Sequence, residues 1–173
     1  MPLNPRFAEP RVEWRDSPDE SEPNAAVAAM KSGSGKAVMA LLGRLLIAAI
    51  FLMSGIAKLT DTPGTVAHMV KMGIPYADTL ALVAGAAEIL GAASLIFGLA
   101  TRAGALGLIL FMIPTTLIFH AFWNYQGAEQ LPQMVNFMKN MAIIGGLSTL
   151  VAVGALRFSV DHRIRRRHHR SIP

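Results

Sequence analysis

An apolar run at residues 79–98 contains a single carboxylate, Glu88, at its centre. At about 1.5 Å per helical residue the run is about 30 Å long, enough to cross the hydrocarbon core of a bilayer. The carboxylate would then lie near the midplane, where an ionisable side chain is costly and usually faces the protein interior. The run therefore predicts a membrane span and marks Glu88 as a candidate functional residue.

Three further runs of similar length predict three more spans, at residues 37–57, 103–119 and 137–156. Hydrophobic residues make up 53% of the chain and charged residues only 16%, which is typical of an integral membrane protein. We expect an all-α fold, a membrane-embedded antiparallel four-helix bundle at residues 37–156. Asp61 followed by Pro63 predicts the start of a short interfacial helix, at about residues 65–72, between the first two spans.

The two ends of the chain differ from the apolar centre. Residues 1–36 hold half of the prolines and six of the eleven acidic residues, which predicts a disordered extension, and translation could instead start at Met30. Residues 157–173 carry six arginines. By the positive-inside rule this predicts cytoplasmic termini, with the tail near anionic lipid headgroups and no nucleic-acid partner expected.

Each of the first two spans has one face of small residues that also carries its charges. On the first span that stripe holds Arg44 and ends at Lys58, and on the second span small residues surround Glu88. Small residues allow close helix packing, so these faces are expected to point into the bundle while Leu and Ile face lipid. Arg44, Lys58 and Glu88 are therefore expected to point inward.

Helical rise puts Arg44 about 10 Å and Glu88 about 15 Å from the same end of their spans. We therefore predict an intramembrane ion pair between Arg44 and Glu88. It either only sets helix register or serves a function directly. Lys58, His120 and Lys139 are expected near the opposite end, where they either line a cationic vestibule above Glu88 or, for the two lysines, only snorkel. Together with Glu88 they are the candidate quinone, proton or ligand site.

The chain contains no cysteine, which excludes thiol–disulfide exchange and thiolate-bound clusters by this chain alone. Neither a metal-ligand cluster nor a hydrolytic triad is evident in the sequence, and no covalent cofactor is expected. Any redox chemistry would therefore use a carrier supplied by a partner. We expect no independent catalysis.

Several separated motifs together resemble the DoxX family between about residues 36 and 156. They are the residues from Arg44 to Leu46 and from Phe51 to Leu59, the Gly73-Ile74-Pro75 turn, Glu88-Ile89-Leu90-Gly91, the residues from Gly98 to Arg102, and Lys139-Asn140 before Gly145-Gly146. The resemblance implies a four-helix inner-membrane protein. It also implies an accessory role beside a quinone-linked oxidoreductase or a redox-stress complex, with a quinone as the possible ligand.

Two other functions agree with the same residues. The chain could be a small transporter or lipid-handling protein in which Glu88 is alternately charged and paired. It could instead be a structural or assembly partner that has no chemistry of its own and whose ion pair holds the helices in register.

Overall fold

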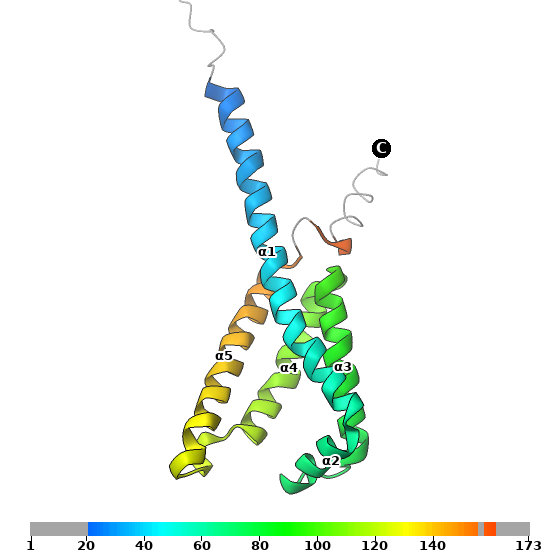
Figure 1. The fold of residues 1–173 in the computed structure, drawn as a ribbon. Coiled ribbons are helices and arrows are strands. Elements are labelled where there is room, and N and C mark those ends of the chain that lie inside the picture. The colour runs from blue at the N-terminus through cyan, green and yellow to red at the C-terminus, as the bar shows by residue number, and fades with distance from the viewer. Residues whose placement is uncertain (1–20, 156–157, 162–173) are drawn as a thin grey trace, which may run out of the picture. The chain divides into compact units, whose positions relative to one another are not determined.

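A computed structural model describes residues 21–155 and 158–161; for residues 21–34 it describes the backbone alone. The described chain is all helical apart from its turns and short loops: α1 (Ser21–Thr60), α2 (Thr62–Lys71), α3 (Ala77–Phe97), α4 (Thr101–Phe119) and α5 (Gln130–Val153). Two 3-10 turns, Phe122–Asn124 and Gly127–Glu129, connect α4 to α5. Figure 1 shows the ribbon.

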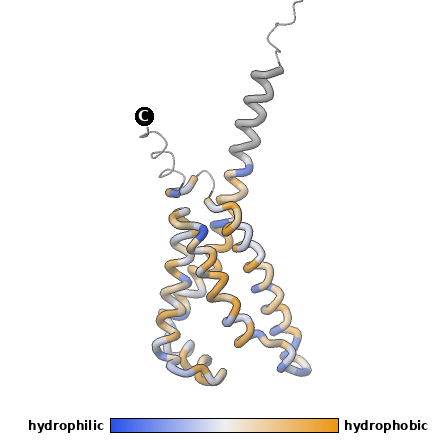
Figure 2. Tube along the Cα trace, turned by 180° about the vertical axis from the view of Figure 1, so that it is seen from behind, coloured by the Kyte–Doolittle hydropathy of each residue, from blue (hydrophilic) through white to orange (hydrophobic). Residues whose placement is uncertain are grey.

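Four of the helices are long and apolar enough to span a membrane, at Gly35–Thr60, Ala77–Phe97, Thr101–Asn124 and Gly127–Val153. Figure 2 shows hydrophobic residues along most of their length. This confirms the antiparallel four-helix membrane fold expected from the sequence. The short helix before the second span, α2, is also present. Its N-cap is Asp61, whose carboxylate accepts from the Gly64 amide, with Pro63 in the first turn.

The largest differences from the expected helix limits are at the starts of three helices, and the other limits differ by at most three residues. α1 already starts at Ser21, so residues 21–36, expected to be disordered, are helical in the structure. The alanines at residues 25–29 favour helix, and the helix continues through Gly33 and Gly35 into the first span. α2 starts three residues early, at Thr62, and α5 starts at Gln130 rather than 137, because the polar residues before the apolar run continue its first turns. Residues 1–20 and the arginine-rich tail from 162 onward lie outside the described residues.

The small-residue faces pack inward as expected. On α3 the buried residues are Ala77, Ala81, Ala84, Gly85, Glu88, Gly91, Ala92 and Leu95. On α1 Arg44, Ala48 and Phe51 are buried, while Leu46 and Met53 are exposed on the outer surface. All four spans contribute to one apolar core, which includes Phe51, Leu95, Leu108 and Leu147.

The turn between α3 and α4 lies at one end of the bundle, called here the turn end, and α2 lies at the other. At the turn end Gly98 adopts a left-handed backbone, φ 64°, and ends α3. A Cβ on Gly98 would lie 2.5 Å from the Ser159 Cβ and 2.9 Å from an Arg44 guanidinium nitrogen. Residues 158–161, beyond α5, therefore fold back onto the turn so closely that only glycine fits there.

Candidate functional site

Two glycines bring α1 and α3 into close contact. A Cβ on Gly55 would lie 2.8 Å from the Gly85 carbonyl oxygen and 3.2 Å from the Glu88 Cβ. A Cβ on Gly85 would lie 2.7 Å from Leu59. Helices that approach this closely through glycine are typical of membrane proteins, where packing replaces the hydrophobic effect as the force between helices. The contact sets the level at which α1 faces Glu88.

At that level Glu88 pairs with Lys58. The Lys58 Nζ lies 2.9 Å from Oε2 and 3.1 Å from Oε1 of Glu88. Ser54, one turn before Lys58, donates its hydroxyl to the same carboxylate at 3.1 Å and accepts from Lys58 at 2.6 Å. The Glu88 side chain is 5% exposed and that of Lys58 is 23% exposed. The carboxylate is thus held by an ammonium group and a hydroxyl from a single turn of α1.

The predicted ion pair between Arg44 and Glu88 is wrong. Arg44 lies at the turn end, where its guanidinium donates to the Phe158 carbonyl at 3.0 Å and the Ile96 carbonyl at 3.5 Å. The prediction measured depth from the expected start of the first span at residue 37. The contact between Gly55 and Gly85 fixes a different axial position of α1 against α3. In that position Arg44 lies level with Gly98, and Lys58 lies level with Glu88.

The charge of Arg44 therefore stabilises contacts at the turn end of the bundle. It lies at the C-terminus of α3, where helix carbonyls attract a cation. Asp161 lies close enough for its charge to act on Arg44. The Asp161 carboxylate also accepts from the Ala100 and Thr101 amides at 2.8 and 3.0 Å, and so supplies the N-cap that the Ala100 side chain lacks. Arg44 is thus part of a structural clasp rather than of a site with Glu88.

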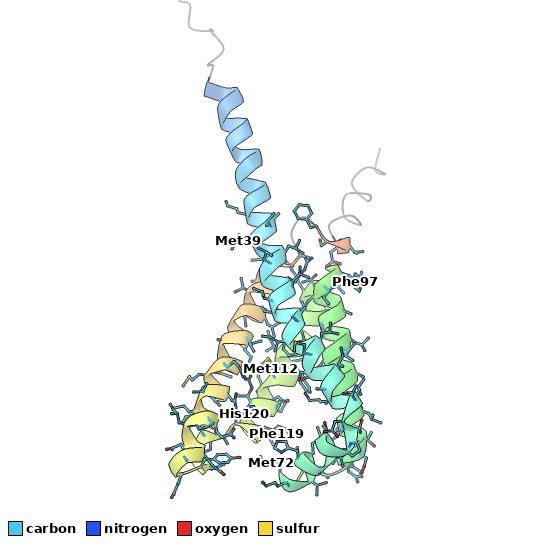
Figure 3. All side chains as sticks on the ribbon, in the orientation of Figure 1. Met39, Met72, Phe97, Met112, Phe119 and His120 are labelled. Carbon is cyan, nitrogen blue, oxygen red and sulfur yellow. The ribbon has the colours of Figure 1, made fainter. Side chains whose placement is uncertain are left out.

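The Lys58 and Glu88 pair forms part of the wall of a cavity of about 340 Å³ inside the bundle. All four spans line it. Its polar residues are Ser54, Lys58, Glu88, Thr115, His120, Lys139 and Asn140, and its apolar residues are Ile50, Phe51, Phe111, Met112 and Ile143. Figure 3 labels Met112 and His120 beside α4 and α5. Pockets for small ligands commonly measure about 300–1,000 Å³, so the cavity is large enough for one ring-sized head group.

The structure brings four of the five candidate residues to this cavity: Glu88, Lys58, His120 and Lys139. The His120 Nδ1 lies 2.8 Å from the Gln133 side-chain oxygen, and Lys139 donates to Asn136 at 2.9 Å. If His120 donates from Nδ1, its neutral ring has an acceptor at Nε2. The cavity thus combines two ammonium groups and an imidazole with one carboxylate.

Three of the lining polar residues, Ser54, Thr115 and Asn140, were missed as site residues. Ser54 is the only hydroxyl in the second half of the first span and lies one turn before Lys58, a spacing that brings two side chains together on one helix face. Asn140 is a buried amide inside an apolar span and donates to Thr116 at 3.0 Å. A polar side chain within an apolar span was the available signal for Ser54 and Asn140.

The fold and the buried polar cavity define a small multi-pass membrane protein, and comparison with known proteins gives its family. The sequence model of the family described as DoxX matches residues 39–121. The inner membrane protein YphA of Escherichia coli K12 is 31% identical over 131 residues, 76% of this chain and 94% of the relative. The inner membrane protein YqjF of the same organism is 33% identical over 128 residues, 73% of this chain and 92% of the relative. No solved structure gives a significant match.

The chain therefore belongs to the DoxX family. The two relatives and the four spans show a multi-pass inner-membrane protein. The matched range contains the whole of α2, α3 and α4. It also contains the part of α1 that carries Ser54 and Lys58, the two residues whose side chains donate hydrogen bonds to Glu88. Lys139 and Asn140, the cavity residues from α5, lie beyond that range.

Proposed function

We propose that the cavity beside Lys58 and Glu88 binds the head group of a membrane quinone, and that the protein is an accessory subunit of a quinone-linked oxidoreductase or a redox-stress complex. The observation that carries the proposal is the composition of the cavity. Two ammonium groups, an imidazole and a carboxylate line one cavity of the four-helix bundle. Glu88 is buried within its span while Lys139 is exposed, and a buried ionisable side chain in a span is expensive, which makes it a candidate for function.

The residues fit such a head group chemically. The two carbonyl oxygens of a quinone accept hydrogen bonds, and Lys139, which donates to Asn136, keeps further ammonium protons at the cavity wall. The Lys58 ammonium group donates to Ser54 and to both Glu88 oxygens, so it would have to exchange one of these bonds for a quinone carbonyl. Phe51, Phe111 and Met112 offer apolar faces for a flat ring. Reduction of a quinone to a quinol takes up two electrons and two protons. Glu88 and His120 are groups that can hold protons at the cavity, whereas the electrons would come from a partner protein.

The two alternative functions predict different molecules bound to the protein when it is purified from native membranes. A transporter or lipid-handling protein would give a uniform species without a partner, active in solute uptake. A structural or assembly partner would bring other subunits but no quinone. Under that alternative the Lys58 and Glu88 pair would act only on stability.

The full chain with a C-terminal affinity tag, purified in mild detergent from native membranes, is expected to retain a quinone and oxidoreductase subunits. The bound quinone is measured by solvent extraction and mass spectrometry. The matched control is the double variant Lys58→Met with Glu88→Gln, in which both charges are removed at similar side-chain size. We expect at least about fivefold less quinone per protein in the control, about 1 kcal/mol of binding free energy. Equal quinone in the two preparations, or none in either, would contradict the proposal.

A further inference from the structure

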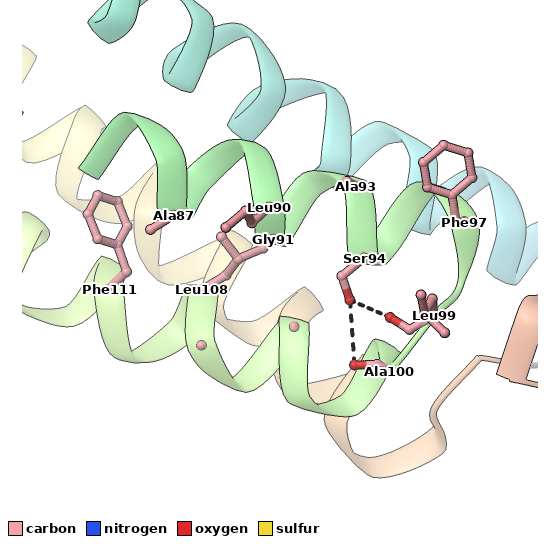
Figure 4. Close-up of a pocket in the computed structure, with 12 residues that line it drawn as sticks. Ala87, Leu90, Gly91, Ala93, Ser94, Phe97, Leu99, Ala100, Leu108 and Phe111 are labelled. Carbon is pink, nitrogen blue, oxygen red and sulfur yellow. Dashed lines mark hydrogen bonds between the residues drawn. The ribbon is translucent and has the colours of Figure 1, made fainter. Parts of the chain in front are cut away.

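Two apolar grooves follow the outer seam between α3 and α4. The first, about 510 Å³, lies toward the turn end and includes Leu90, Phe97, Gly107 and Leu108. Figure 4 shows it, with Phe111 near one end and Phe97 near the other. Its hydroxyl, that of Ser94, donates to the Leu99 carbonyl at 2.7 Å. The groove therefore offers an almost wholly apolar surface.

The second groove, about 280 Å³, lies toward the α2 end, between α2, α3 and the second half of α4. Ala87 and Phe111 line both grooves, so the two meet at these residues. Phe111 and Thr115 also line the polar cavity. The Thr115 hydroxyl donates to the Phe111 carbonyl of its own helix at 2.8 Å. Phe111 thus borders the polar cavity and both grooves.

The α3 residue that lines both grooves is small. It is Ala87, with Val83 and Leu90 about one turn away on either side, and Glu88, the next residue, lines the polar cavity. Phe111 and Thr115 are the residues shared by the polar cavity and the second groove, and Phe111 is the larger of the two. Side-chain rotamer changes are fast, so Phe111 is the group whose movement we test as the connection between the two spaces.

We infer that the ligand is a two-part molecule that enters sideways from the bilayer: its polar head passes Phe111 into the cavity, and its long apolar tail lies in the first groove between α3 and α4. The inference rests on the proposed function and deepens it. A polar cavity that adjoins a long apolar groove matches a ring with an isoprenoid tail, since each part meets a surface of its own polarity. Before binding, the tail lies in lipid and not in water, so its binding is not driven by the hydrophobic effect. It is driven by the packing contacts that the tail makes in the groove.

Two tryptophan variants test the tail path separately from the head site. Ala87→Trp fills the junction, and Gly107→Trp fills the groove one turn of α4 before Phe111, where a Cβ meets no atom within 4 Å. Their matched controls are Ala86→Trp and Gly145→Trp. Ala86 is exposed and lines neither groove, and a Cβ on Gly145 also meets nothing within 4 Å.

The measurement is the Kd of two probes in nanodiscs, 2,3-dimethoxy-5-methyl-benzoquinone without a tail and the same ring with a ten-carbon tail. Partition into lipid cancels when variants are compared with one probe. We expect Ala87→Trp and Gly107→Trp to weaken binding of the tailed probe at least about tenfold. Gly107→Trp should leave the Kd of the tail-less probe within about twofold. Ala87→Trp, which fills the path of the head group, should also slow association of the tail-less probe, and the controls should change neither Kd.

Three results would overturn the inference. One is an unchanged Kd for the tailed probe in both groove variants, which would leave the groove to a phospholipid chain or a neighbouring helix. Another is equal weakening of both probes by Gly107→Trp, which would mean that this variant disturbs the head site. The third is failure of the tail-less probe to bind the wild-type protein, which would overturn the proposed function as well. The first two results would contradict the tail path but not the proposed quinone site. The experiment therefore distinguishes failure of this inference from failure of the proposed function.

Discussion

Glu88→Gln is expected to lower the free energy of unfolding in detergent by about 3 kcal/mol, at the lower end of the range for breaking a buried ion pair. The substitution leaves the Lys58 ammonium group, whose side chain is 23% exposed, without its carboxylate. Ser54 also loses a charged acceptor. Unfolding is followed by titration with sodium dodecyl sulfate or by heating, with helix content as the signal.

A double-mutant cycle measures which cation, Lys58 or Arg44, is energetically coupled to the Glu88 carboxylate. Adding Lys58→Met to Glu88→Gln should recover most of the loss, because no unpaired charge then remains, with a coupling energy of about 1–3 kcal/mol. The matched control is Arg44→Met in the same background. Its effect should be additive with that of Glu88→Gln, because Arg44 donates to the Phe158 carbonyl at the turn end. Coupling of Glu88 with Arg44 and not with Lys58 would contradict the structure.

Gly55→Leu should have an effect of comparable size by a different route. A Cβ on Gly55 already lies 2.8 Å from the backbone oxygen of Gly85, which no rotamer change can move. α1 and α3 must therefore separate, and we expect a loss of at least about 2–3 kcal/mol of stability from overpacking. Separation also pulls Lys58 away from Glu88. Unfolding and quinone retention are measured on the same preparation.

The control for this prediction is Gly145→Leu on α5. A Cβ on Gly145 meets no atom within 4 Å, so a leucine there can project from the bundle without moving a helix. Its stability should stay within about 0.5 kcal/mol of the wild type, as for surface substitutions. If both leucines had the same effect, the close contact between α1 and α3 would not be the feature that positions the site.

The direction in which each span residue points could be predicted from the sequence, whereas the level of one helix against another could not. The period of the α-helix and the small residues on α1 and α3 indicate the inward faces, and Arg44, Lys58 and Glu88 do point inward. Arg44 and Lys58 lie on the same stripe. Which of them reaches Glu88 therefore depends on the offset of α1 along its axis.

That offset is set by contacts between residues far apart in the chain, Gly55 and Gly85 on α1 and α3, and residues 158–161 on the turn after α3. The start of the first apolar run is no measure of depth, because α1 continues as a helix back to Ser21. Similarly, nothing local to the sequence around Asp161 indicates that its carboxylate caps α4, since the two segments are about sixty residues apart.

The central claim is that the cavity beside Lys58 and Glu88 binds a quinone head group, and titration of the tail-less benzoquinone tests it most directly. The full chain and the double variant Lys58→Met with Glu88→Gln are compared in nanodiscs after their stabilities have been matched. Saturable binding by the wild type and at least about tenfold weaker binding by the double variant is the expected result, a difference of about 1.4 kcal/mol. Equal affinity in the two proteins, or no saturable binding by the wild type, would contradict the claim.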